Sequence, residues 1–192
     1  ALSAAIEDSS YKIAHLWATD YDSDTCETYR RNICPEKPES VICNDIRNYD
    51  LKKFQKFGTL DCLAFGFPCN DFSVVGEQKG VKGSFGPLYT YGIQVLKLYK
   101  PKCFLAENVG GLRSANDGKA ITKIFNDMRA AGYRIYPNLY KFEEYGIPQA
   151  RHRIIIVGIR KDLPLDFKIP SSKGFKVKTC KDAIDNPPIK KN

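Results

Sequence analysis

The sequence has few of the side chains that metal and redox sites require. It contains two histidines, and its seven cysteines never occur as Cys-x-x-C, the close spacing typical of zinc and redox centres. We therefore expect no metal site. The cysteines are odd in number and several lie in apolar runs, where a thiol packs as a small hydrophobic group. This usage favours a reducing compartment over a disulfide framework.

Long hydrophobic segments are absent as well. No apolar run approaches the roughly 20 residues that a membrane-spanning helix needs. The first residues do not combine a charged start with an apolar stretch, as a secretion signal would. We expect a soluble, intracellular protein with no membrane partner.

The charge balance is moderately positive. Lys and Arg number 30 against 22 Asp and Glu, which gives a formal net charge of +8. Such a chain is attracted to polyanions, including nucleic acids. A basic soluble protein with solvated lysines would have the same balance, so charge alone does not identify a partner.

Short apolar runs alternate with helical patterns along the 192 residues. Each run is short enough to be a strand, and the runs cover residues 13–19, 41–44, 59–66, 103–106, 134–140 and 154–159. Apolar residues recur at helical spacing from Ile121 to Ala131 and from Leu88 to Tyr99. This alternation is typical of βαβ units and predicts an α/β fold, with a mostly parallel sheet in one domain. From Pro164 onward we expect an exit from the core, because periodicity is lost.

The segment Gly66-Phe-Pro-Cys-Asn-Asp-Phe-Ser73 directly follows one of the predicted buried strands. It therefore lies at the carboxyl end of that strand, where ligands bind in open α/β sheets. Cys69 in this proline-containing loop is placed to act as a nucleophile if its surroundings lower its pKa. Taken alone, the stretch also fits a cysteine that only packs.

Two further motifs place charged side chains near predicted strand ends. Glu107 follows the run 103–106, and a carboxyl group beside apolar residues can hold a proton near neutral pH because desolvation raises its pKa. A buried glutamate that caps the next helix is the alternative. Arg151 and Arg153 precede the last run and share one face if the strand begins early. Their guanidinium groups then need an anion or an electron-rich ligand between them. The alternative is that both side chains lie at a solvated strand edge and bind nothing.

Taken together, these motifs resemble those of the DNA cytosine-5 methyltransferases. The hallmarks are Pro68-Cys69, then Glu107-Asn108-Val109, then Gln149-x-Arg151-x-Arg153, in the family's order and approximate spacing. Each is weak alone, but the ordered set is specific, and the similarity extends from about Ala1 to Lys161. It implies a Rossmann-like, S-adenosylmethionine-dependent methyltransferase fold, with a mostly parallel sheet and helices on both faces.

The resemblance also implies a chemical role for each catalytic residue. Cys69 becomes the nucleophile that adds to carbon 6 of cytosine, and Glu107 contacts the N3 edge of the base. Arg153, supported by Arg151, donates to the cytosine carbonyl. Carbon 5 then becomes nucleophilic enough to take a methyl group from S-adenosylmethionine. The target base must be flipped out of the duplex, since these atoms are inaccessible inside it.

The cofactor site is implied in the same way. Asp20 would take the ribose hydroxyls, and Tyr21 would lie against the adenine ring. Asp45 and Ile46 would contact the adenine. The remaining cofactor contacts implied by the resemblance are Pro68 and Leu88. For Asp20 and Asp45 the alternative is helix N-capping, which aspartate commonly performs.

Some features depart from the family pattern. Asn70 stands where glutamine is usual, and Tyr21 stands where tryptophan is frequent. The first strand with its glycine-rich loop, the target-recognition region and the last conserved segments do not occur in these residues. We expect residues 1–163 to be a partial catalytic domain and residues 164–192 to lead toward the recognition region. We therefore expect the 192-residue chain alone to be inactive.

The resemblance points to double-stranded DNA as substrate and to a bacterial restriction-modification system. A cognate restriction endonuclease would then be a functional partner in the bacterial cytoplasm. Two alternatives stay open. An RNA (tRNA) cytosine-5 methyltransferase would share every catalytic residue, although Phe72-Ser73 favours the DNA branch over the Phe-Thr of the RNA branch. A truncated, non-catalytic relative is the second.

Overall fold

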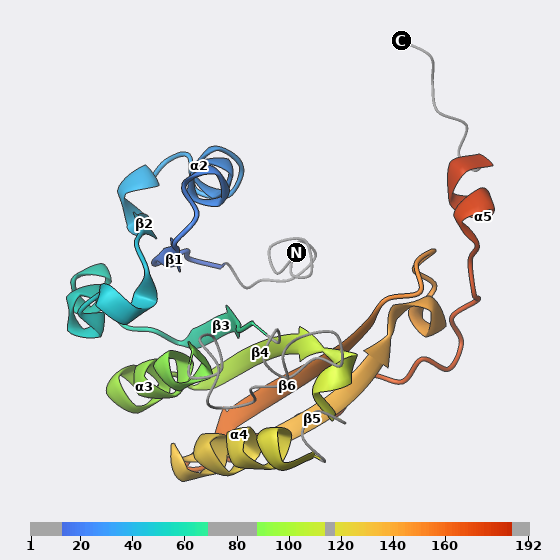
Figure 1. Ribbon diagram of the computed structural model, residues 1–192. Coiled ribbons are helices and arrows are strands. Elements are labelled where there is room, and N and C mark those ends of the chain that lie inside the picture. The colour runs from blue at the N-terminus through green and yellow to red at the C-terminus, as the bar shows by residue number, and fades with distance from the viewer. Residues whose placement is uncertain (1–12, 69–87, 114–117, 186–192) are drawn as a thin grey trace. The chain divides into compact units, whose positions relative to one another are not determined.

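The computed structural model describes residues 13–68, 88–113 and 118–185 (Figure 1). The chain divides into two compact units, Ala1–Leu60 and Asp61–Asn192, which are described separately. Across the described ranges, no helix is both long and apolar enough to cross a membrane.

The first unit is built around a short parallel strand pair and one helix. Its elements are β1 (Ala18–Asp20), α2 (Ser23–Asn32) and β2 (Val41–Cys43), with 3-10 helices at Pro38–Ser40, Ile46–Asn48 and Leu51–Phe57. Helix α2 begins after Asp22, whose carboxylate accepts a hydrogen bond from the backbone N–H of Thr25 at 2.7 Å. The fully buried Phe54 stacks on Trp17 with ring centroids 3.9 Å apart, which gives this small unit its aromatic core.

The second unit contains a four-stranded sheet. Its strands are β3 (Cys62–Gly66), β4 (Cys103–Val109), β5 (Tyr133–Lys141) and β6 (His152–Arg160), in the order β3-β4-β6-β5. Its helices are α3 (Tyr89–Tyr99), α4 (Lys119–Ala130) and α5 (Cys180–Asp185), with 3-10 turns at Gly110–Arg113 and Phe142–Tyr145. Strands β3 and β4 are parallel, whereas β6 runs antiparallel to both of its neighbours. Three strands therefore share one direction, and the sheet is mostly parallel.

Alternation along the strands separates the two faces of this sheet. On β4, the residues Phe104, Ala106 and Asn108 are buried, whereas the residues between them are half-buried. Helices α3 and α4 pack on the buried side (Figure 1). The phenol of Tyr133 lies in this core and donates to the carbonyl of Pro101 at 2.8 Å, so its polar atom is satisfied.

All six predicted strands and both predicted helices are confirmed, with shifted ends. The first strand is shorter than the expected 13–19, because β2 offers it only three pairing partners. Strand β4 is longer than the expected 103–106, because antiparallel pairing with β6 continues to Val109. Glu107 is therefore inside the strand rather than after it.

Residues 164–185 add no strand to the sheet and contain only the short helix α5. This segment contacts the turn after β5, where the Tyr145 hydroxyl donates to the carbonyl of Pro170 at 3.0 Å and the Cys180 thiol donates to the carbonyl of Pro148 at 3.2 Å. The expected boundary at 163/164 stays a prediction.

Packing on the buried side allows no side chain at Gly158. A Cβ there would lie 2.0 Å from the ring of Phe104, which is only 1% exposed and cannot move aside. We expect Gly158→Ala to lower the free energy of unfolding by about 1–3 kcal/mol or more, as overpacking does. Gly111→Ala, where a Cβ meets nothing within 4 Å, is the control and should change it by less than about 1 kcal/mol. Equal denaturation midpoints for both variants of the full-length protein would contradict this packing.

Candidate active site

Glu107 and Arg153 form an ion pair at one end of the four-stranded sheet. The Arg153 Nε lies 2.7 Å from Glu107 Oε1, and the two side chains are 18% and 41% exposed. In the antiparallel pairing of β4 and β6, Arg153 lies opposite Val109 and Glu107 opposite Ile155, so the two residues share a face two positions apart. The desolvation that the sequence suggested for Glu107 is only partial, and its carboxylate faces a cation.

The backbone around Arg153 is fixed by several contacts. The Arg153 Nη1 donates to the carbonyl of His152 at 2.8 Å. The His152 ring lies 2.6 Å from the Glu143 carboxylate, and this contact links the start of β6 to the 3-10 turn after β5. A backbone hydrogen bond, followed by the contact with His152, holds the pKa of Glu143 below its usual value. Arg153 is therefore presented from an anchored strand end.

Arg151 does not share this arrangement. Strand β6 begins at His152, so Arg151 precedes it and strand alternation does not place its side chain. The residue is exposed, and its carbonyl accepts the backbone N–H of Phe142 at 3.0 Å. Of the two arginines in the motif, only Arg153 contacts Glu107.

Cys69 lies outside the described residues, but the strand that leads to it is described. Strand β3 ends at Gly66, three residues before Cys69, and Gly66 pairs directly with Glu107. A Cβ at Gly66 would lie 3.9 Å from Glu107 Oε2, so the carboxylate lies beside this glycine. The chain therefore enters the Pro68-Cys69 segment next to the Glu107 carboxylate.

Asn108 is a residue whose role the sequence did not reveal. It is 2% exposed, and its Nδ2 donates to the carbonyl of Phe67 at 3.1 Å, while its Oδ1 accepts the backbone N–H of Val109 at 2.8 Å. Phe67 directly precedes Pro68, so this amide ties β4 to the start of the cysteine segment. A single polar side chain on the apolar side of a strand is the sequence signal that could have indicated such a tether.

The first unit brings the predicted ribose and adenine residues to one edge. Strands β1 and β2 are parallel, and Asp20 pairs with Cys43 at their carboxyl ends. The backbone N–H of Asn44 donates to the carbonyl of Asp20 at 2.8 Å, which extends this pairing toward Asp45. The Tyr21 side chain is 78% exposed beside this edge, and Ile46 is half-buried.

Helix capping accounts for Asp45 but not for Asp20. Asp45 caps the 3-10 helix Ile46–Asn48 by accepting from the backbone N–H of Arg47 at 2.9 Å. The Arg47 guanidinium also binds it, and these contacts lower the pKa of Asp45. Helix α2, in contrast, is capped by Asp22, while Asp20 accepts from the backbone N–H of Asp22 at 3.0 Å. The Asp20 carboxylate is left exposed.

Pro68 and Leu88 belong to the second unit. Pro68 is half-buried directly after β3, and Leu88 is half-buried directly before α3. The structure thus assembles Glu107 with Arg153 in one unit, and Asp20 with the strand before Asp45 in the other.

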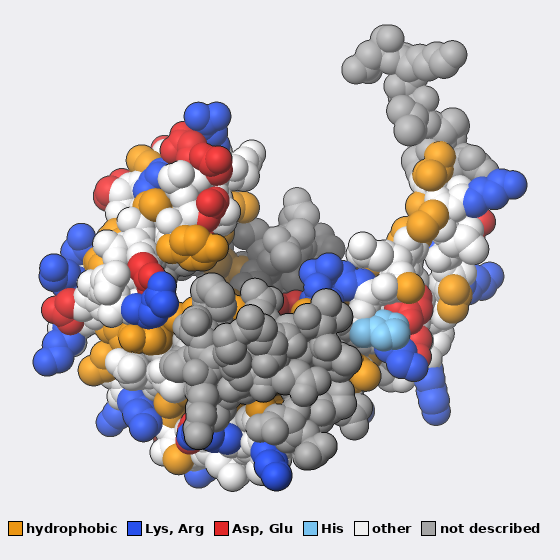
Figure 2. Space-filling view, in the orientation of Figure 1, with side chains coloured by type: hydrophobic (Ala, Val, Ile, Leu, Met, Phe, Trp, Pro, Cys, Tyr) orange, Lys and Arg blue, Asp and Glu red, His pale blue; other side chains and the backbone are white. Residues whose placement is uncertain are grey.

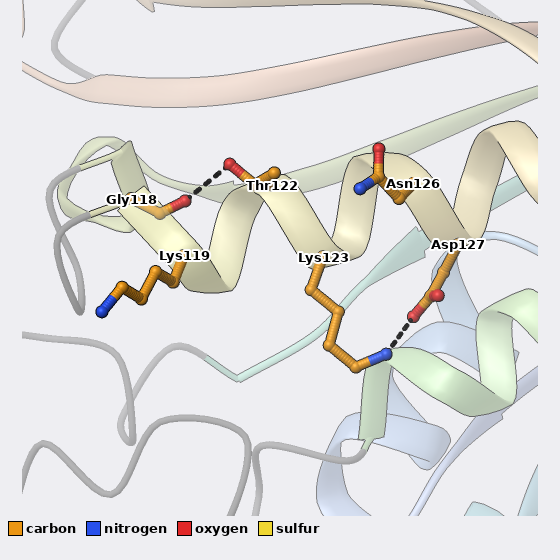
Figure 3. Close-up of a pocket in the computed structure, with 6 residues that line it drawn as sticks. All are labelled: Gly118, Lys119, Thr122, Lys123, Asn126 and Asp127. Atoms are coloured by element: carbon orange, nitrogen blue, oxygen red, sulfur yellow. Dashed lines mark hydrogen bonds and ion pairs between the residues drawn. The ribbon is translucent and has the colours of Figure 1, made fainter.

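A surface hollow of about 480 Å³ lies along α4 and contains none of the predicted site residues. Its walls come from one helix face, where Lys123 binds Asp127 at 3.0 Å and the Thr122 hydroxyl donates to the carbonyl of Gly118 (Figure 3). Asp127 also accepts from the Tyr89 hydroxyl at 2.8 Å. The Tyr89–Asp127 bond joins α3 to α4, whereas the other two contacts lie within α4 and its N-cap, so these polar groups have a structural role.

On the face that Figure 2 shows, basic side chains are spread over the described residues rather than gathered in one patch. Figure 2 shows Lys and Arg side chains on both units, with Asp and Glu among them. The net charge of +8 therefore acts as a general attraction to polyanions.

Solved structures of methyltransferases share this arrangement of strands and helices. The Dnmt2 methyltransferase of S. pombe matches with a TM-score of 0.63 at 18% identity, over 98% of this chain and 52% of that one. The fold is thus the Rossmann-like fold of S-adenosylmethionine-dependent methyltransferases.

The family follows from sequence. The model described as C-5 cytosine-specific DNA methylase matches residues 2–191, and the chain belongs to this family. The Type II methyltransferase M.BbvI of Brevibacillus brevis is 53% identical over 93% of this chain and 49% of its own length. M.NgoFVII of Neisseria gonorrhoeae, also a Type II methyltransferase, is 39% identical over 81% of the chain and 40% of its own length. The chain spans about half the length of the curated relatives it matches.

The Asn108 tether makes a measurable contribution to stability. Asn108→Ala leaves the Phe67 carbonyl buried without its partner, so we expect the free energy of unfolding of the full-length protein to fall by about 1–3 kcal/mol. Asn126→Ala, at an exposed position on α4, should change it by less than about 0.5 kcal/mol. Denaturant titration of both variants tests this, and a loss no larger than that of the control would show that the amide does not stabilise the fold.

Proposed function

We propose that the protein containing this chain is an S-adenosylmethionine-dependent DNA cytosine-5 methyltransferase of a Type II restriction-modification system. The observation that supports it most is the Glu107–Arg153 ion pair beside Gly66, three residues before Cys69. A potential nucleophile, a carboxyl group and a guanidinium group are thereby linked to one end of one sheet. The family and the Type II relatives support the same reaction.

The two charged side chains match the hydrogen-bonding edge of cytosine. The base offers acceptors at its carbonyl oxygen and N3 and a donor at its amino group. Arg153 donates to the carbonyl oxygen, and Glu107 donates a proton to N3 while its second oxygen accepts from the amino group. In uracil and thymine, N3 carries a hydrogen and a carbonyl stands in place of the amino group. Glu107 therefore discriminates against these two bases.

The nucleophile overcomes the low reactivity of carbon 5. The Cys69 thiolate adds to carbon 6, and Glu107 stabilises this adduct through N3, so carbon 5 gains enamine character. S-adenosylmethionine supplies an electrophilic methyl group to that carbon. Loss of the carbon 5 proton, elimination of the thiolate and return of the N3 proton to Glu107 then restore the aromatic ring and regenerate both Cys69 and Glu107.

The residues of the first unit fit the cofactor. The exposed Asp20 carboxylate at the end of a parallel strand suits the ribose hydroxyls, and the exposed Tyr21 ring offers a face for the adenine. Ile46 adds apolar contact. The Asp45 carboxylate is already bound by the backbone N–H and the guanidinium of Arg47. Asp45 therefore contributes to the adenine site mainly by fixing the backbone of this turn. For Pro68 and Leu88, the proposed cofactor contact rests on the resemblance to the family alone.

DNA is the proposed substrate, and the base is flipped out of the duplex to reach Cys69. Arg151 is exposed and precedes Arg153 by two residues. It either attracts the phosphate backbone of DNA or supports Arg153 in its contact with the cytosine. Residues 1–163 form part of the catalytic domain, and residues 164–192 lead to a target-recognition region. The enzyme acts in the bacterial cytoplasm together with a cognate restriction endonuclease.

Transfer of labelled methyl groups tests the reaction and its substrate. We expect the full-length protein to label carbon 5 of cytosine in duplex DNA, and Cys69→Ser to reduce the label to background because the serine hydroxyl is a far weaker nucleophile. Transfer RNA is assayed in parallel. Label in RNA alone would move the protein to the RNA branch. A folded protein that binds the cofactor and labels neither substrate would be a non-catalytic relative.

The cofactor assignment makes a separate prediction. Asp20→Ala should weaken the binding of S-adenosylmethionine to the full-length protein roughly 10- to 100-fold, because hydrogen bonds to a charged acceptor are lost. Asp24→Ala is the matched control, since this exposed acid lies in the first turn of α2 and has no predicted ligand role. Isothermal titration calorimetry measures both affinities. If the two variants bind equally well, Asp20 does not hold the ribose.

A further inference from the structure

Two cysteines face each other at the end of the sheet opposite to Glu107. Cys62 is the first residue of β3 and Cys103 the first of β4, and the parallel pairing places them directly opposite each other. Both are free thiols, with Cys62 exposed and Cys103 half-buried. The methyltransferase mechanism uses neither of them.

The geometry of neighbouring strands permits a bond between these sulfur atoms. Paired strands lie about 4.8 Å apart, which falls within the Cα–Cα range of roughly 4.4–6.8 Å found across disulfides. Residues opposite each other in a parallel pair project to the same face. The two side chains therefore lie next to each other on one face of the sheet.

The surroundings make the two thiols unequal. The neighbouring Cys62 thiol lowers the pKa of Cys103 to about 7, although burial and the Asp61 carboxylate raise it, and Lys102, which binds Asp61 at 2.8 Å, lowers it further. Cys103 in turn raises the pKa of Cys62. Cys103 is therefore the more easily ionised thiol of the pair, and in its protonated form it donates to the carbonyl of Asp61 at 3.9 Å.

We propose that Cys62 and Cys103 are a reversible oxidation site, at which a small disulfide such as oxidised glutathione is reduced and a cross-strand disulfide forms. The Cys103 thiolate attacks one glutathione sulfur, that disulfide bond breaks, and glutathione leaves as a thiolate. Cys62 then loses its proton and attacks the Cys103 sulfur of the mixed disulfide. The second glutathione thiolate leaves and takes up a proton, so two protein thiols have been oxidised and one disulfide reduced.

The rate advantage of Cys103 is modest. A lower pKa raises the thiolate fraction of Cys103 at neutral pH, but it also lowers the intrinsic nucleophilicity of that thiolate. Selectivity therefore comes from the opposed Cys62, which resolves the mixed disulfide, and the linked product is the readout to measure.

The test uses the full-length protein, oxidised glutathione, acid quenching, alkylation of remaining thiols and digestion without reductant. We expect mass spectrometry to find a linked peptide pair joining Cys62 to Cys103, which disappears after treatment with dithiothreitol. Its absence, while exposed Cys43 or Cys180 carries glutathione, would overturn the proposal. This outcome does not depend on methyltransferase activity.

Two variants test the assigned order of attack. Cys62→Ser should accumulate a lasting glutathione adduct on Cys103, because no thiol remains to resolve it. Cys103→Ser should give no adduct on Cys62 above that on Cys43. Cys180→Ser is the control and should leave the linked pair unchanged. The reverse pattern, with the lasting adduct on Cys62, would overturn the assignment of Cys103 as the attacking thiolate, and the wild-type result decides the site even if a variant fails to fold.

Discussion

The antiparallel pairing of β6 with β4 is the constraint on which the candidate active site depends. Nearly 50 residues separate Glu107 from Arg153 in the sequence, yet the register brings them within 2.7 Å. A slip by one residue would send Arg153 to the opposite face, so the register itself selects the pair. Strand β3 pairs in parallel with β4, and its end at Gly66 lies beside the same carboxylate.

An ion pair of this kind has consequences for a substrate. Neither side chain is fully buried, so each can exchange its partner for a ligand without the large penalty of a fully desolvated charge. Under the proposed function, the pair keeps the two groups close to the positions that cytosine requires. The anchoring of β6 through His152 and Glu143 and the tether through Asn108 limit how far they can drift.

Much of this arrangement could be predicted from sequence. Apolar periodicity located every described strand of the sheets, and motif order indicated which strand ends carry Glu107 and Arg153. The sequence could not reveal that β4 continues through Glu107, because a strand's length depends on its partner. The sequence could not separate helix capping from ligand binding at Asp45, because both roles use the same carboxylate. Only the structure shows that Arg47 binds this carboxylate. Asn108 was missed because its hydrogen bond to Phe67 spans 41 residues.

The ladder between β1 and β2 contains only three residue pairs, and a two-stranded sheet of that size is marginal by itself. Asp20 and the strand before Asp45 meet at its end, so a molecule bound there spans both strands. Ligand binding and local folding are then linked equilibria, in which stability rises with free ligand concentration as RT ln(1 + [L]/Kd). Under the proposed function, a cofactor bound at this edge and the folded strand pair would therefore stabilise each other.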